Sequence, residues 1–201
     1  MSNTSSISIC SNALILLGSQ PISSFTDGSD RSKAVGNLYE FAQEEVLRSH
    51  PWNAATKRAL LSPLVGQPAF DFRYVFQLPG DWLRTIQVGK LECPIEYTIE
   101  GRQILCDVQS LPLVYVWRNT VESTWDATLV SVMTYYMKAA MAYWVTQSTT
   151  QAQQAAQEFL VTLRQAKSIN GQDEGPQTLG DFPLLVQRQS GWPANGMRGA
   201  R

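Results

Sequence analysis

The spacing of apolar residues changes twice along this chain, and that change restricts its fold more than any other feature. From Ser6 to Leu17 and from Ala34 to His50, apolar side chains recur at the spacing of an amphipathic helix. Between Pro68 and Arg118 they alternate with polar ones, as from Phe70 to Leu78, which is typical of a strand with one buried face. After Thr124 the helical spacing returns. This order of helices, strands and helices predicts an α+β protein.

We therefore expect a four-helix bundle with an inserted small antiparallel β subdomain and an extended C-terminal tail. The first two helices occupy residues 1–67, the β subdomain 68–120, the last two helices 121–169 and the tail 170–201. The subdomain is expected to hold about five strands in one sheet. The long helix after Thr124 carries a stripe of Tyr, Met and Trp side chains, which is more typical of a core than of a cofactor site.

The single histidine of the chain lies where the second helix is expected to end. His50 is followed by Pro51, which disfavours helical geometry at the residue before it, and then by Trp52. An imidazole in a last helical turn can bind free carbonyl groups, and a tryptophan after it can anchor the chain against the bundle. Because no second histidine and no convincing serine or cysteine partner accompanies His50, we interpret His50, Pro51 and Trp52 as a structural joint. An interface role is the alternative.

Composition and charge exclude several classes of protein. Lys and Arg number 16 and Asp and Glu 17, so the net charge of −1 predicts no global attraction to DNA or to acidic membranes. No apolar run approaches a membrane span and no secretion signal begins the chain, so we expect no membrane and a cytoplasm-like site of synthesis. Cys10, Cys93 and Cys106 are scattered without a CxxC pair, which predicts free thiols and no metal or other cofactor.

The search for catalytic motifs predicts that the chain is not an enzyme. No nucleotide-binding, zinc-protease, nucleophile-elbow or calcium-loop motif occurs. A pair of acids for acid–base chemistry is conceivable, but both sets are interpreted as solvated faces. These sets are Glu44 and Glu45, and Glu92, Glu96 and Glu100.

Two alternative functions remain open at this level. A tail-associated cell-wall hydrolase requires a carboxylate pair such as Glu96 and Glu100. A nucleic-acid-binding module requires that folding bring scattered cations onto one basic face. Those cations are Lys57, Arg58, Arg73, Arg84, Arg102 and Arg118.

The last 32 residues differ from the rest of the chain, with six glycines, three prolines and no regular period. They nevertheless carry apolar side chains that are poorly placed in water, and ordering each residue costs about 1–2 kcal/mol of backbone entropy. We therefore predict that another chain accepts this tail, and that the acceptor is mildly acidic, because no acid follows Phe182. The predicted docking residues are Leu179, Phe182, Leu184, Leu185, Val186, Arg188, Trp192 and Arg198.

Six segments in a fixed order resemble the bacteriophage tail tubular protein A family, the head-to-tail adaptors of short-tailed phages. The resemblance spans Ile9 to Ala166, and its most specific pieces are LRSHPWNAATKRALL and YVFQLPGDWLR. The other pieces are ICSNALILLGSQPISSFTDGS, YTIEGRQILCD, PLVYVWR and MTYYMKAAMAYWVTQS.

The resemblance implies a non-catalytic virion protein that forms a homo-oligomeric ring, similar to the dodecamers of that family. Such a ring joins the portal above to the tail nozzle, or a tail tubular protein B-like protein, below. Double-stranded DNA passes transiently through its channel, and the near-neutral charge suits passage, because many phosphate contacts would hold the DNA. The resemblance also implies that the tail grips the portal, and that the protein is made in the bacterial cytoplasm and resides at the head-tail interface.

Overall fold

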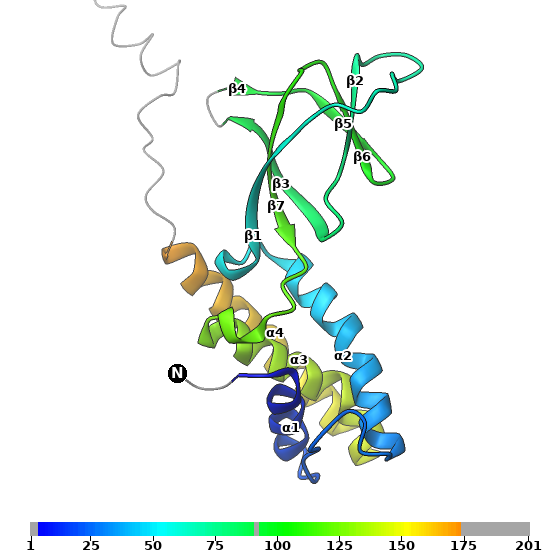
Figure 1. Cartoon of the computed structure of the whole chain (residues 1–201). Coiled ribbons are helices and arrows are strands. Elements are labelled where there is room, and N and C mark those ends of the chain that lie inside the picture. Colours follow the sequence, from blue (N-terminus) through cyan, green and yellow to red (C-terminus); the bar gives the residue numbers. More distant parts are fainter. Residues whose placement is uncertain (1–3, 91–92, 174–201) are drawn as a thin grey trace, which may run out of the picture.

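The structure is a computed structural model that describes residues 4–90 and 93–173. Its helices are α1 (Ser6–Leu16), α2 (Asp30–Ser49), α3 (Ala127–Thr146) and α4 (Thr149–Gln172), with short 3-10 helices at Asn53–Ala55 and Glu122–Thr124. Its strands are β1 (Thr56–Leu61), β2 (Tyr74–Gln77), β3 (Trp82–Lys90), β4 (Cys93–Pro94), β5 (Tyr97–Glu100), β6 (Gln103–Cys106) and β7 (Leu111–Trp117). The helices gather at one end of the molecule and the strands at the other (Figure 1).

Local capping signals set the ends of the helices. The Ser5 hydroxyl accepts from the Ser8 backbone and the Asp126 carboxylate from the backbone of Thr128 and Leu129, so each side chain satisfies N–H groups at a helix start. Gly18 stops the first helix with a φ of +74°, a conformation that glycine adopts without strain. Helix α2 ends at Ser49, and His50 before Pro51 is already extended, so the expectation that His50 lies in the last helical turn is wrong by one residue.

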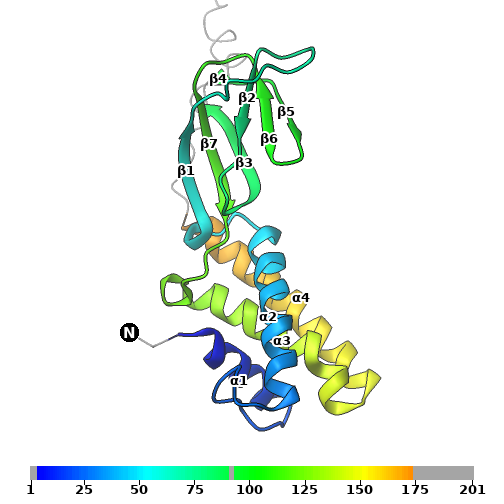
Figure 2. The same ribbon diagram turned by 45° about the vertical axis from the view of Figure 1, so that its right-hand side comes forward.

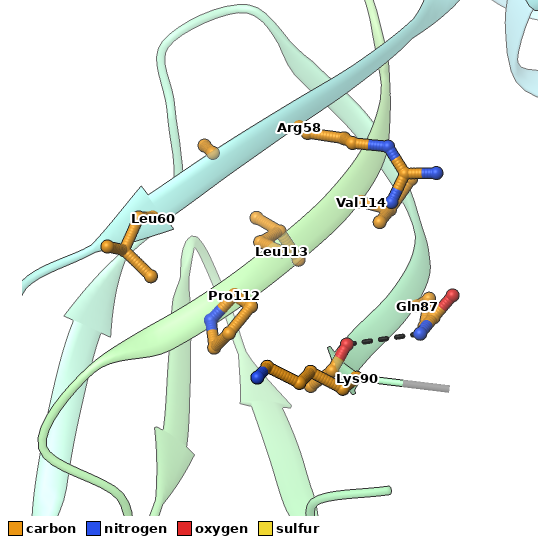
Figure 3. Close-up of a pocket in the computed structure, with 9 residues that line it drawn as sticks. Arg58, Leu60, Gln87, Lys90, Pro112, Leu113 and Val114 are labelled. Atoms are coloured by element: carbon orange, nitrogen blue, oxygen red, sulfur yellow. Dashed lines mark hydrogen bonds between the residues drawn. The ribbon is translucent and has the colours of Figure 1, made fainter. Parts of the chain in front are cut away.

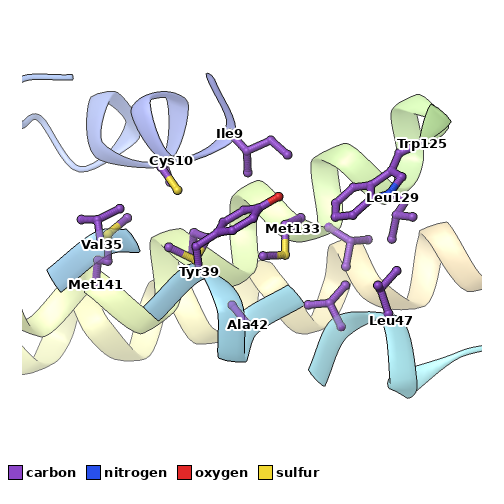
Figure 4. Close-up of a cluster of buried hydrophobic side chains, with 14 of the residues drawn as sticks. Ile9, Cys10, Val35, Tyr39, Ala42, Leu47, Trp125, Leu129, Met133 and Met141 are labelled. Atoms are coloured by element: carbon purple, nitrogen blue, oxygen red, sulfur yellow. The ribbon is translucent and has the colours of Figure 1, made fainter. Parts of the chain in front are cut away.

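The expected four-helix bundle is wrong, because the chain is an α+β fold in which four helices adjoin two antiparallel sheets, and the helices pack unevenly on one another. Helix α3 packs against each of the other three, whereas α4 packs mainly on α3. Helix α4 contributes Ala166 to the buried helical cluster, and its Phe159 and Leu163 pack against that cluster while only partly buried. The helical part of this α+β fold is thus centred on α3, whose Met133 Figure 4 shows near Ile9 and Cys10 of α1 and Tyr39 of α2.

The expected single small sheet is also wrong, because the seven strands form two antiparallel sheets. One has the order β1-β7-β3-β4 and the other β2-β6-β5. Apolar side chains from both sheets meet in one buried cluster, including Phe76 and Ile104 from the second sheet and Leu113 and Tyr115 from the first. Two sheets form because β6 pairs with the adjacent β5 and with the more distant β2, and these three strands cover the inner face of the first sheet (Figure 2).

Two strands differ from the sequence prediction for identifiable reasons. Strand β1 lies within residues 1–67, where helices are expected, and its sequence TKRALL shows no regular alternation. The expected strand from Phe70 to Leu78 is shortened to β2, because Asp71 adopts a left-handed conformation with φ of 69° and Phe70 is 76% exposed.

Candidate functional site: a joint between helices and sheets

The polar side chains that link distant segments concentrate where the chain passes between the helices and the sheets. We define the joint as the two connections, residues 50–55 and 118–126, together with the end of α4. Figure 1 shows both connections and the end of α4 close to the base of β1. The joint contains the histidine that the sequence singled out.

Trp52 is the buried anchor of the outgoing connection. Its side chain is 0% exposed, and its indole Nε1 donates a 2.9 Å hydrogen bond to the carbonyl of Val46, in the last turn of α2. The Ser49 hydroxyl donates to the same carbonyl. The Trp52 carbonyl then accepts from the Thr56 hydroxyl, where β1 begins. Trp52 therefore closes a helix end through its side chain and fixes the start of a strand through its backbone carbonyl.

His50 lies just beyond the last helical residue, with extended backbone angles of −151° and 149°. Its ring contacts the Trp52 ring edge to face, with centroids 4.9 Å apart. Its Nε2 lies 3.3 Å from Nδ2 of Asn170, near the end of α4. The structure thus brings His50, Pro51 and Trp52 together with a helix that begins about a hundred residues later.

Two buried asparagines complete the joint. Asn170 accepts from the Asn53 backbone at 3.1 Å and donates to the Pro51 carbonyl, which holds the end of α4 against the outgoing connection. Asn119, on the return connection, donates to the Ala54 carbonyl at 2.8 Å and accepts from the Val121 backbone. The sequence analysis missed both asparagines, because their backbone partners lie far along the chain and leave no local signal.

An ion pair ties the sheet side of the joint to the β2–β3 turn. Lys57 Nζ lies 2.8 Å from Asp81 Oδ2 and 3.4 Å from the centre of the Trp117 ring. Asp81 also accepts from the Tyr115 hydroxyl, and its backbone carbonyl accepts from the Arg118 N–H. Burial raises the pKa of Asp81, but the hydrogen bonds from Lys57 and Tyr115 and the charge of Lys57 outweigh burial and leave that pKa below its usual value.

A polar cleft of about 410 Å³ lies beside the return connection. Within it the Glu122 carboxylate accepts from the Tyr39 hydroxyl at 3.1 Å and from the Gln43 amide at 3.5 Å. Burial, followed by the charge of Glu122, raises the pKa of Tyr39 and raises the pKa of the nearby Cys10 thiol to about 12. Neither group is ionised near neutral pH, so the cleft offers no activated nucleophile.

The candidate acids that the structure describes do not converge on a catalytic pair, and Glu92 lies outside the described residues. Glu44 lies 3.2 Å from Arg118, and Glu45 accepts from the Tyr136 hydroxyl at 2.5 Å. Glu96 and Glu100 are exposed at β5, in the second sheet. Across residues 4–90 and 93–173, no group of three or more His, Cys, Asp or Glu residues could hold a metal ion. The two cysteines whose side chains are described, Cys10 and Cys106, are buried and free.

The candidate cations are spread over the molecule rather than gathered on one face. Lys57 and Arg58 are neighbours on β1 and therefore point to opposite faces of the sheet. Several cations are engaged locally: Arg84 donates to the Arg48 carbonyl at 3.1 Å, and Arg102 to the Pro79 carbonyl at 2.7 Å. Within the part of the chain that the structure describes, none of the helices is both long and apolar enough to cross a membrane.

The predicted docking residues of the tail, from Leu179 to Arg198, lie outside the described residues. No family model matches the chain, and no curated protein matches it either. The geometry that bears on function is therefore that of the joint and of the surfaces around it.

Proposed function

We propose that this chain is a structural protein of a phage virion, a head-to-tail adaptor that forms a ring between the portal and the tail nozzle. One observation carries the proposal. The segments on which the resemblance to tail tubular protein A depends contribute the contacts of the joint, including Trp52, the Lys57–Asp81 pair and Trp117. These contacts are structural in kind: buried rings, backbone hydrogen bonds and one ion pair.

A rigid joint suits an adaptor, because an adaptor must hold two binding ends at a set distance and angle. The helices and the sheets provide two such ends (Figure 1). In this proposal the protomers meet head to tail around a closed, dodecameric ring, and the C-terminal tail docks on the portal. The nozzle binds below, DNA passes transiently through the channel, and the protein performs no catalysis.

Electron microscopy of the purified protein mixed with the portal protein of the same phage tests the proposal. We expect rings seated on the portal with the natural chain and none with Phe182→Asp or Trp192→Asp, because a charge in the apolar tail opposes its burial. The matched control is Phe70→Asp, since Phe70 is equally aromatic and 76% exposed at a β-subdomain loop. If the natural chain also fails to bind the portal, the adaptor function is wrong. Equal binding by all variants would instead exclude the tail as the docking segment.

A further inference from the structure

Apart from the two-residue β4, which ends the first sheet on its other side, two strands that end a sheet have one edge that no described residue pairs with. Strand β1 pairs with β7 alone and ends the first sheet, and β5 pairs with β6 alone and ends the second. The edge of β2, by contrast, is partly covered, because Leu64 donates a 2.7 Å backbone hydrogen bond to Val75. Uncovered edges present backbone N–H and C=O groups to any strand that fits, so proteins generally protect them.

The two uncovered edges lie on opposite sides of the β region. Figure 2 shows β1 at one side and β5 at the other, and Figure 1 agrees. Edges so placed in one protomer cannot pair with each other, but β1 of one copy can meet β5 of the next. This is the arrangement of a head-to-tail contact that repeats from copy to copy.

The outer faces of the two strands carry opposite charges. Arg58 and the 72% exposed Leu60 lie on the outer face of β1, beside a groove of about 580 Å³ that crosses the sheet toward Lys90. Figure 3 shows Arg58 and Leu60 from β1 next to Pro112 and Val114 from β7, and no acid lines this groove. At β5 the exposed acids are Glu96 and Glu100, and neither these acids nor Arg58 forms an ion pair within the described residues.

The inner faces of the same strands are both apolar. Ala59 and Leu61 of β1 pack partly against the sheet cluster. Tyr97 and Ile99 of β5 lie opposite Cys106 and Ile104 of β6 and so share their face, yet remain 39% and 37% exposed at the rim of that cluster. If β5 adds to β1, the apolar faces adjoin on one side of the joined sheet, and Arg58 adjoins the acids on the other.

We propose that the uncovered edge of β1 binds the β5 edge of a second copy of this chain, in an edge-to-edge strand pair with Arg58 facing Glu96 or Glu100. The occupant is a second copy because the chain itself carries the complementary strand. An edge pair of four to six residues falls short of the roughly 1,200–2,000 Å² that a stable interface buries, so a single contact is weak. This contact gives the proposed ring its inter-protomer interface, but the pairing itself does not require a portal.

Sedimentation of the free full-length chain at low salt, from about 1 μM to about 1 mM, tests the pairing because that range brackets weak contacts. We expect the natural chain to associate toward the top of this range, and less so at high salt. Arg58→Glu and Glu100→Arg should each weaken association at least about tenfold, because like charges then face each other. An equimolar mixture of the two variants should restore it, because every contact between unlike protomers again pairs opposite charges.

The mixture guards against a misfolding explanation, since two unfolded variants would not rescue each other. Arg164→Glu, an equally exposed charge reversal on α4, is the matched control and should associate like the natural chain. A natural chain that stays monomeric throughout, or variants that associate as it does, would overturn the edge pairing. Association that follows these charges without any binding to the portal would uphold the pairing and reject the adaptor function.

Discussion

The helical region and the sheet region bury their apolar residues to different extents. The cluster centred on α3 contains 20 buried residues, whereas the cluster between the two sheets contains 8. The burial of apolar side chains therefore stabilises the helical region more than the sheet region. Exposed large apolar side chains occur in both regions, such as Leu60 and Phe70 in the sheet region and Phe41 in α2, so the difference lies in the size of the buried clusters. The difference indicates that the sheets depend for their stability on the joint and, in the proposed ring, on neighbouring copies.

One strand takes part in both clusters. Val116 of β7 belongs to the helical cluster, while Leu113 and Tyr115 belong to the sheet cluster and Trp117 packs against both. A substitution at the joint should therefore lower the stability of both regions. Changes within one cluster should act mainly on that region.

The largest expected effect comes from Trp52→Ala, which removes the anchor shared by the two regions. We expect a loss of about 4–5 kcal/mol in the free energy of unfolding, from the vacated volume and the lost hydrogen bond to Val46. Urea titrations followed by far-UV circular dichroism measure the loss, and hydrogen exchange of the amides in each region shows where protection falls. Trp144→Ala, at a half-exposed position on α3, should cost under about 1 kcal/mol. A Trp52 variant with unchanged exchange protection in the sheets would contradict the joint.

A smaller effect, of about 3–4 kcal/mol, is expected for Phe76→Ala in the sheet cluster, where the side chain is 0% exposed. Because that cluster is small, the sheets should lose hydrogen-exchange protection while the helices keep theirs. Met137→Ala, at an equally buried position on α3, should cost a similar amount but lower protection mainly in the helices. Uniform loss of protection in both variants would show that the two regions unfold as one unit.

The smallest effect concerns one ion pair in each region. The pKa of Asp81 is lowered in the folded protein, so its pairing with Lys57 stabilises the fold above the unfolded pKa of about 4 and is lost as the pH falls through the folded pKa. In the helices, the hydrogen bond from Lys138 lowers the pKa of Glu158, with the same sign. Both pairs are partly exposed, so each contributes about 1 kcal/mol or less.

Urea midpoints between about pH 2 and pH 6 measure these contributions, since that range spans carboxylate titration. Asp81→Asn and Glu158→Gln should each be less stable than the natural chain at pH 6 and should approach it at pH 2. The Asp81 variant should lower hydrogen-exchange protection mainly in the sheets, and the Glu158 variant mainly in the helices. A constant difference across the pH range would mean that the lost contact is not electrostatic.

Local signals were sufficient to predict the helices and several strands. The proline at position 51 and the glycine at position 18 end helices through the geometry of single residues, and the β5–β6 hairpin turns at Gly101, whose φ is 59°. Such features act over a few residues and are readable from the chain. The arrangement of the helices was not predictable in this way, because it depends on contacts between helices that lie far apart in the sequence.

The joint shows the same limit of prediction from sequence, here for a candidate site. His50, Pro51 and Trp52 were singled out because proline, tryptophan and a lone histidine at a helix end form a local pattern. Asn119 and Asn170 were missed, because an asparagine is a common surface residue until folding buries it against a distant backbone.

The periodicity of the sequence predicted helices on both sides of a strand region along the chain, because the spacing of apolar residues in a helix or a strand depends on near neighbours. Strand β1, the pairing of β1 with β7, and the division into two sheets came from the folded chain, since Leu61 and its partner Leu111 lie 50 residues apart. The opposed free edges of β1 and β5 are likewise a property of the assembled sheets. No local pattern encodes them, because an edge exists where a partner strand is missing.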